Sequence, residues 1–402
     1  MICNKSGTGI LILAMLLVGM ILIPAASAQE EKNHSVTAEK AFEHANAQMI
    51  SFISGDAPNF ENWTGASIDP NPQELYDING QKLFYQFSVY NEKKLIGTID
   101  ICADKTLGHS INDIAFDPEP FKAAEAMTKS IEIAKNKYPD GKIKSTIMVV
   151  YSYPSIGAMT VVKDKITGVE HRIFVDAYTL NEVEDKPATE TELGVWSMYE
   201  MILENGVEEN LKEWEKSDQF TKSIEQAAAN KGVDINVAVT EENMKKLSGD
   251  AAVMASTSKK LGVPLRGQED EYFCVPASCQ MISLYYGYPT PSQTYIYEYE
   301  GGDYLSGLAA EDAVHYCKYK LDKSGTVIYT QLSNVDAIKE IDNYRPFFSL
   351  ITGHSRVCQG YKIDGGYTYL YINDPEPIGS SGTPKIERTY GSKEIKRVYV
   401  RN

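Results

Sequence analysis

The chain has 402 residues, of which 43% are hydrophobic and 23% charged, a composition typical of globular proteins and not of disordered or collagen-like chains. Its formal net charge is −16, which disfavours nonspecific attraction to phosphate backbones or anionic lipid surfaces. We therefore expect no nucleic acid among its partners. The length allows two or three domains of about 150 residues each.

The first 28 residues have the layout of a secretory signal peptide. Lys5 supplies a positive charge, an apolar run covers residues 10–23, and small residues follow at 26–28. The apolar run has 14 residues, fewer than the about 20 that a membrane-spanning helix needs. A retained membrane anchor is the alternative. We expect removal of residues 1–28 and a mature protein that is secreted or otherwise extracytoplasmic, with no membrane partner.

A helix followed by antiparallel strands is predicted twice in the N-terminal half. Apolar residues at helical spacing predict the helices, and short apolar runs between turn residues predict the strands. The first pattern has a helix at 36–53 and strands at 75–78, 82–90 and 95–102. The second has a helix at 118–138 and strands at 145–153, 158–163 and 171–178. We expect two helix-on-antiparallel-sheet modules, at residues 29–117 and 118–189.

The amino-acid composition changes near residue 262. Residues 190–261 are rich in Glu, Lys, Met and Ala, and this composition predicts a helical connector. From residue 262 onward Tyr, Gly and Pro become frequent, which indicates a separate domain at 262–402. The predicted fold class is α+β.

Cysteine usage does not indicate a disulfide scaffold. Five cysteines remain after the predicted signal peptide, and they are Cys102, Cys274, Cys279, Cys317 and Cys358. An odd number leaves at least one thiol free or paired with another molecule. We expect Cys279, Cys317 and Cys358 to be packed thiols, and neither Cys nor His residues show a metal-ligand spacing. No metal or cofactor is expected.

The segment around Cys274 has the features of a nucleophile at the start of a helix. Downstream apolar residues recur at helical spacing until Gly287, and Pro276 fits a first helical turn. The partial positive charge of a helix N-terminus favours the thiolate form of a cysteine. Gln268 precedes Cys274 by six residues and carries an amide that can donate to a developing oxyanion.

A base and an orienting group are predicted on one hairpin. His354 opens a strand, a turn follows at residues 364–366, and a second strand ends at Asp374. If the hairpin pairs Ile363 with Tyr367, Asp374 lies opposite Arg356, on the face that carries His354. His354 and Asp374 are then diagonal neighbours about 7–8 Å apart at the backbone, within reach of their side chains.

These residues resemble a known family in their order and local motifs. The matching segments are Gln268, Cys274-Val275-Pro276-Ala277-Ser278, Gly353-His354-Ser355-Arg356-Val357, Gly360-Tyr361 and Asn373-Asp374-Pro375. Residues 262–402 resemble the papain-like cysteine peptidases, in the branch related to bacteriocin leader peptidase domains. The resemblance implies that Cys274 is the nucleophile, His354 the base and acid, Asp374 the orienting group and Gln268 the oxyanion donor. Papain itself has Asn in place of this Asp, so Asn373 is the alternative to Asp374.

The N-terminal half resembles the pro-segments of streptopain-type peptidases. We therefore expect a secreted papain-like cysteine peptidase that acts on peptides or proteins and is held inactive by its N-terminal half until cleavage within residues 232–265. A permanent attachment module is the alternative for that half. For the whole protein, the alternatives are a non-catalytic extracellular binding or adhesion protein and an acyl or amide transferase that uses the same three groups.

Overall fold

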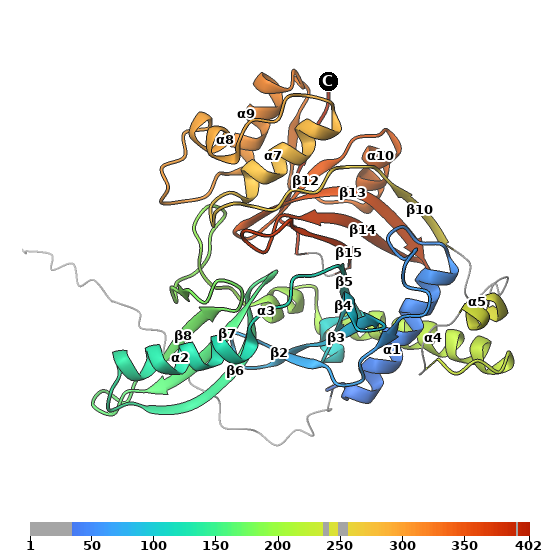
Figure 1. Cartoon of the computed structure of the whole chain (residues 1–402), viewed down its shortest axis with the longest axis horizontal. Coiled ribbons are helices and arrows are strands. Elements are labelled where there is room, and N and C mark those ends of the chain that lie inside the picture. Colours follow the sequence, from blue (N-terminus) through green and yellow to red (C-terminus); the bar gives the residue numbers. More distant parts are fainter. Residues whose placement is uncertain (1–33, 236–240, 248–255, 391–392) are drawn as a thin grey trace, which may run out of the picture. The chain divides into compact units, whose positions relative to one another are not determined.

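The computed structural model describes residues 34–235, 241–247, 256–390 and 393–402 (Figure 1). The predicted signal peptide at residues 1–28 lies outside the described residues. The described helices are α1 (Ala38–Ser54), α2 (Ala123–Lys137), α3 (Met198–Leu203), α4 (Val207–Asn230), α5 (Glu241–Leu247), α7 (Cys274–Tyr285), α8 (Gln293–Tyr299), α9 (Ala310–Lys320) and α10 (Asn334–Asp342), with a short 3₁₀ helix η1 (Lys105–Leu107).

Strands of the N-terminal half are β1 (Ser67–Ile68), β2 (Gln73–Asp77), β3 (Lys82–Asn91), β4 (Lys94–Cys102), β5 (Ile111–Phe116), β6 (Lys142–Ser152), β7 (Ser155–Lys163), β8 (Glu170–Asp176) and β9 (Glu182–Val183). Strands of the C-terminal half are β10 (Ser256–Lys260), β11 (Val327–Tyr329), β12 (Phe347–Ile351), β13 (His354–Asp364), β14 (Tyr367–Asp374), β15 (Thr383–Arg388) and β16 (Lys396–Tyr399).

These strands form one continuous sheet within the described part of the chain. Its order is β11-β16-β12-β13-β14-β15-β5-β4-β3-β2-β6-β7-β8-β9, with β1 beside β3 and β10 beside β13. The pairing of β2 with β6 is parallel and the other pairings of described strands are antiparallel. The halves of the chain meet where β15 pairs with β5, for example Ile386 with Ile114. Backbone hydrogen bonds therefore join the N-terminal half to the C-terminal half.

Strand alternation explains why the C-terminal strands are rich in tyrosine. Successive side chains of a strand point to opposite faces of the sheet. In β14, Tyr367, Tyr369 and Tyr371 join the apolar core that the N-terminal half builds around α1. Leu370 and Ile372 join a second core beneath α7. The C-terminal sheet is thus buried on both faces, and one of those faces is covered by the N-terminal half.

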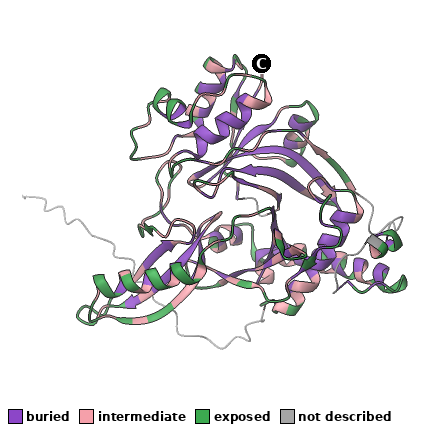
Figure 2. Ribbon diagram, in the orientation of Figure 1, coloured by how far each residue is buried: buried purple, intermediate pink, exposed green. Residues whose placement is uncertain are grey.

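α1 begins after a capping residue, whereas α2 begins at Ala123, later than the predicted start at residue 118, and has no side-chain cap. α1 follows Thr37, whose side-chain oxygen accepts a hydrogen bond from the Lys40 backbone N–H at 3.2 Å. The helix α2 packs on β6, β7 and β8 and exposes its outer face, whereas α7 is buried along most of its length (Figure 2). A helix that is apolar on nearly all sides belongs inside the molecule. None of the described helices has both the length and the apolar character that a membrane span requires.

The structure mixes helices with a large sheet, and the two expected N-terminal modules are not separate in it. Parallel pairing of β2 with β6 places Tyr76 beside Val149, so the strands of both expected modules belong to the same sheet. The expected helical connector at 190–261 contains α3, α4 and α5 but ends in β10, which pairs with β13. A polar sequence such as that of β10 gave no strand signal because its edge position, and not its side chains, determines its conformation. The expected domain boundaries stay predictions.

Candidate active site

Cys274 is the first residue of α7, as the sequence predicted. Phe273 is the N-cap, and Cys274 is 8% exposed. The helix rests on β13 through a hydrogen bond from Ser278 Oγ to the Ser355 carbonyl oxygen at 3.2 Å. Because Ser278 and Ser355 follow Cys274 and His354 in their elements, this contact sets the thiol beside the imidazole. The Cys274 thiol is among the groups that interact with the His354 imidazole and raise its pKa.

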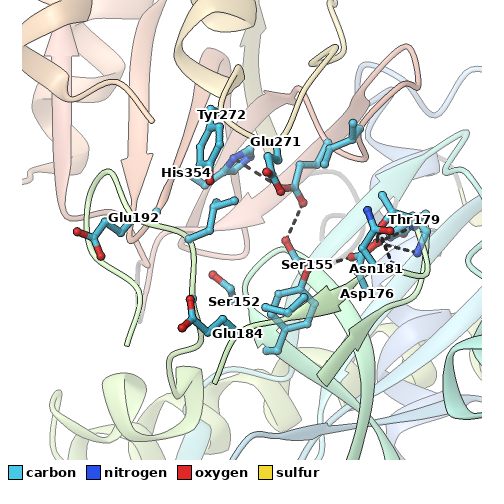
Figure 3. Close-up of a pocket in the computed structure, with 18 of the residues that line it drawn as sticks. Ser152, Ser155, Asp176, Thr179, Asn181, Glu184, Glu192, Glu271, Tyr272 and His354 are labelled. Atoms are coloured by element: carbon cyan, nitrogen blue, oxygen red, sulfur yellow. Dashed lines mark hydrogen bonds and ion pairs between the residues drawn. The ribbon is translucent and has the colours of Figure 1, made fainter. Parts of the chain in front are cut away.

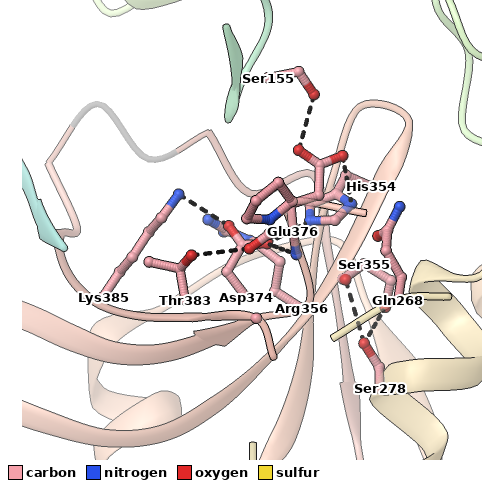
Figure 4. A network of polar contacts seen from close by, with 12 residues as sticks. Ser155, Gln268, Ser278, His354, Ser355, Arg356, Asp374, Glu376, Thr383 and Lys385 are labelled. Carbon is pink, nitrogen blue, oxygen red and sulfur yellow. Dashed lines mark hydrogen bonds and ion pairs between the residues drawn. The ribbon is translucent and has the colours of Figure 1, made fainter. Parts of the chain in front are cut away.

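His354 and Asp374 meet on the hairpin of β13 and β14. His354 Nε2 lies 2.8 Å from Asp374 Oδ1, and both side chains are buried (Figure 4). The turn pairs Asp364 with Tyr367, one step from the expected register. A bulge between Cys358 and Gly360 then shifts the pairing by one residue. The bulge restores the expected alignment, so Asp374 reaches the imidazole as predicted.

The residue beside Asp374 points elsewhere. Asn373 donates a hydrogen bond from Nδ2 to the Val263 carbonyl oxygen at 3.0 Å, and its Oδ1 accepts one from Gln359. Neighbouring residues of a strand face opposite sides of the sheet. Asp374, and not Asn373, is therefore the group that contacts His354.

The charges around His354 favour its protonated form. Burial lowers the pKa of His354, but the Asp374 and Glu376 carboxylates outweigh burial and raise it to about 10. Burial likewise opposes ionisation of Asp374, yet Lys385 and His354 hold the pKa of that carboxyl well below its usual range. Lys385 Nζ lies 3.1 Å from Asp374 Oδ2. A lysine, a carboxylate and an imidazole thus form a buried chain that ends at the thiol.

Gln268 is held rigidly next to this chain. The side chain is 2% exposed, its backbone N–H donates to the Pro375 carbonyl oxygen at 2.9 Å, and its carbonyl accepts from Gly379 N at 2.9 Å. Nε2 donates to the Asp270 carbonyl oxygen at 3.3 Å. Since a side-chain amide carries two N–H donors, one remains for a ligand. The placement agrees with the predicted oxyanion role, which stays a prediction.

Two glycines make these positions possible. Gly353 precedes His354 in the tight turn between β12 and β13 and has φ +71°, a conformation that favours glycine. Gly267 precedes Gln268, and a Cβ there would lie 2.0 Å from the Ser380 carbonyl oxygen. The sequence motifs around Gln268 and His354 therefore have a steric reason for their glycines.

A family model matches the part of the chain that carries this site. Residues 260–401 match the Peptidase_C39 like family. The C-terminal part of the chain is a Peptidase_C39-like domain. No curated protein matches the chain.

Two solved structures are similar to about a third of this chain at low identity. The crystal structure of UfSP from C. elegans has a TM-score of 0.29 and 12% identity, over 36% of this chain and 34% of that one. The chain thus spans about a third of the length of UfSP. The peptidase domain of Streptococcus ComA, a bifunctional ABC transporter of a quorum-sensing pathway, has a TM-score of 0.26 and 19% identity, over 35% of this chain and 99% of that domain.

A cavity of about 390 Å³ opens beside the candidate catalytic residues of the C39-like domain. Gln268, Tyr272 and His354 line one side, and the N-terminal half supplies the opposite wall from β6, β7 and the loops near β8 and β9 (Figure 3). Ser155 and Asp176 belong to that wall. A peptide that reaches the thiol through this cavity would contact both halves of the chain.

Sequence reasoning did not single out Glu376, Ser155 or Lys385. Glu376 Oε1 lies 4.0 Å from His354 Nδ1, and Glu376 Oε2 accepts a hydrogen bond from Ser155 Oγ at 2.9 Å. Glu376 follows Asp374 by two residues, which was the available signal. Ser155 is distant in sequence, and only the tertiary structure brings it to the site.

The other cysteines of the chain do not resemble Cys274. Cys102, Cys279, Cys317 and Cys358 are free and fully buried. Burial raises the pKa of each of these four thiols. Within the described ranges, no group of three or more His, Cys, Asp or Glu residues is arranged to hold a metal ion. The chemistry that the described site can supply is that of a thiol, an imidazole and buried carboxylates.

Proposed function

We propose that this protein is a cysteine peptidase that hydrolyses peptide bonds with Cys274, His354, Asp374 and Gln268. The observation that carries the proposal is the imidazole of His354, which lies 2.8 Å from the Asp374 carboxylate and interacts electrostatically with the Cys274 thiol. A nucleophile, a base and an orienting group in hydrogen-bond contact are the minimal set for covalent acyl transfer. The match of residues 260–401 to the Peptidase_C39 like family supports the same proposal.

In the proposed reaction, the Cys274 thiolate attacks the carbonyl carbon of the scissile bond. The oxyanion accepts hydrogen bonds from the second Nε2–H of Gln268 and from the Cys274 backbone N–H, which has no partner within the helix because it belongs to the first turn. The His354 imidazolium gives its proton to the leaving amine, and the C–N bond breaks. His354 then takes a proton from water, whose oxygen attacks the acyl-enzyme and releases the thiolate. Asp374 keeps the imidazole in the orientation that presents Nδ1 to the thiol.

The test is a pair of cysteine variants in one helix. Cys274→Ala should abolish cleavage of a casein digest and labelling by iodoacetamide, because it removes the nucleophile. Cys279→Ala is the control: its thiol is fully buried and its pKa is raised well above the ordinary value. Cys279→Ala should still cleave the casein digest and should still be labelled by iodoacetamide. Full cleavage by Cys274→Ala would contradict the proposal, and product analysis with added amine would distinguish hydrolysis from acyl transfer.

We propose further that the N-terminal half is a permanent part of the enzyme and not a removable cover. Support comes from the pairing of β5 with β15 and from polar contacts across the two halves, two of them buried and two part-buried. The contacts are Ser51 with Asp364 at 2.8 Å, Tyr153 with Glu387 at 2.7 Å, Ser155 with Glu376 at 2.9 Å and Glu213 with Arg388 at 3.0 Å. Removing the N-terminal half would break these hydrogen bonds and expose to water the apolar face of the C-terminal sheet that it covers.

A further inference from the structure

The cavity beside His354 carries an excess of negative charge. Its walls contain six carboxylates and two cationic groups, the Lys186 ammonium and the His354 imidazolium. The carboxylates are those of Asp176, Glu182, Glu184, Glu192, Glu271 and Glu376. They come from both halves of the chain, so the charge is a property of the assembled cavity and not of one acidic loop (Figure 3).

Several of these carboxylates already have partners. Asp176 Oδ1 accepts hydrogen bonds from the loop that follows β8, including the Thr179 backbone N–H at 2.7 Å. Glu182 pairs with Lys137 at 2.6 Å. Lys186 lies 3.1 Å from Glu184 and 4.0 Å from Glu192, so one ammonium group faces two carboxylates.

Glu271 and Glu376 face the cavity without a lysine or arginine partner among the described residues. Glu271 lies three residues before Cys274, is exposed to the cavity and has no hydrogen bond or ion pair with a described residue. Glu376 contacts Ser155 and approaches only the His354 imidazole, at 4.0 Å. Burial, followed by Asp270, raises the pKa of Glu271, and burial raises that of Glu376. A cation bound in the cavity would stabilise the ionised form of both carboxylates.

A second observation, independent of these charges, indicates a ligand at the same place. Gln268 lines the cavity and is 2% exposed, yet its Oε1 accepts no hydrogen bond from any described residue. A buried amide oxygen without a donor is costly unless a ligand supplies one. An ammonium or guanidinium group has several N–H donors and no acceptor, so it suits both the carboxylates and this oxygen.

We propose that the cavity selects substrates with a cationic side chain, Arg or Lys, close to the scissile bond. This inference deepens the proposed peptidase function and rests on it for the position of the cation relative to the cleaved bond. Glu271 is the main recognition group because it is the carboxylate with no other partner. The two halves of the chain then share one task, since the C39-like domain supplies the chemistry and the N-terminal wall supplies much of the charge.

The experiment compares matched peptides on the full chain. Quenched fluorescent peptides of Ala, Gly and Ser carry one Arg, moved along the sequence, or citrulline, its neutral isostere, at the same place. Cleavage is measured with the wild type, and binding is measured by fluorescence anisotropy with Cys274→Ala. We expect the Arg peptide to be favoured about three- to tenfold in both measurements, the size of one or two partly exposed ion pairs. The preference should shrink between about 10 mM and about 1 M NaCl, as the Debye length falls from about 30 Å to about 3 Å.

Two acidic variants complete the design. Glu271→Gln should lose most of the preference for Arg over citrulline in both cleavage and binding. Glu311→Gln, an exposed carboxylate in the first turn of α9 that does not line the cavity, should keep the preference. Equal cleavage and equal binding of the two peptides would overturn the inference and leave the peptidase proposal standing. Absence of cleavage of every peptide would count against the peptidase function, and the binding measurement would still decide whether the cavity selects a cation.

Discussion

At the scale of single residues, the site depends on how a buried histidine keeps its proton. Burial by itself lowers the pKa of His354, yet the pKa is raised to about 10 because Asp374 and Glu376 lie beside the ring. Asp374 is in turn kept ionised by Lys385 and His354 despite its own burial. The imidazolium that must protonate the leaving amine is therefore present over a wide pH range.

Replacing Asp374 by Asn should reveal this dependence. The variant removes the first of the charges that oppose burial, so the pKa of His354 should fall and the alkaline limb of the kcat/KM profile should move to lower pH. The measurement is a pH profile of peptide cleavage, with the Cys279→Ala variant as a control that should keep the wild-type limb. An alkaline limb that stays in place in Asp374→Asn would contradict the assigned contact.

The contact between His354 and Asp374 also predicts how the stability of the fold depends on pH. The pKa of His354 is higher in the folded chain, so its stabilising contribution is complete below the ordinary value of 6.5 and is lost as the pH rises toward about 10. The pKa of Asp374 is lowered, so its contribution is present above the ordinary value of 3.8 and is lost as the pH falls below it. In urea unfolding, Asp374→Asn should therefore lose more free energy of unfolding, relative to the wild type, between pH 3.8 and pH 6.5 than near pH 10. An equal deficit at all pH values would indicate lost packing alone.

Gln268 offers a separate test of the oxyanion role. Gln268→Ala removes one donor and should lower kcat by about 10²–10³ with little change in KM, because the lost hydrogen bond forms only in the transition state. The exposed Gln219→Ala on α4 is the control and should have no effect. If Gln268→Ala cleaves as fast as the wild type, its amide has no oxyanion role.

At the scale of elements, local patterns predicted the elements that carry the candidate chemistry. The observed α7 starts at Cys274 and the observed β14 covers Tyr367–Asp374, as the apolar spacing and the turn residues indicated. The turn register differed by one residue, and the bulge between Cys358 and Gly360 compensated for it. A bulge has no simple sequence signal because it depends on strain between paired strands. The alignment of His354 with Asp374 was therefore predicted correctly through a different set of pairs.

Elements whose formation depends on distant partners were missed. β5 pairs with β15 across the two halves, and β10 pairs with β13 although its sequence is polar. Neither β5 nor β10 has an apolar alternation long enough to indicate a strand by itself. Each is held by the hydrogen bonds of a partner far along the chain.

At the scale of the whole molecule, the N-terminal half is bound to the C39-like domain through both backbone and core. Residues 34–402 cluster as one structural unit. Three tyrosines of β14 and Ile386 of β15 lie in the core that α1 and the N-terminal strands build. A pro-segment that leaves after cleavage would expose this apolar face to water, which is unfavourable in proportion to its area.

A single cut in the chain tests this arrangement. A site for a specific protease is introduced between residues 247 and 256 of the full chain, and the protein is cut after purification. We expect the two fragments to elute together in size-exclusion chromatography and peptide cleavage to stay at the uncut level, because the β5–β15 pairing and the shared core are untouched. An uncut protein without the new site, treated with the same protease, is the control. Release of the N-terminal fragment together with a rise in activity would instead support the pro-segment expectation.

The sequence by itself determined the local chemistry of this protein. It placed a thiol at the start of a helix and an imidazole and a carboxylate on one hairpin, because helix starts, turns and strand alternation depend on neighbouring residues. Only the tertiary structure decided that Ser155 contacts Glu376 beside His354, and that both halves of the chain share one sheet and one acidic cavity. Ser155 and Glu376 lie 221 positions apart, and no local pattern specifies which distant surfaces will bury each other.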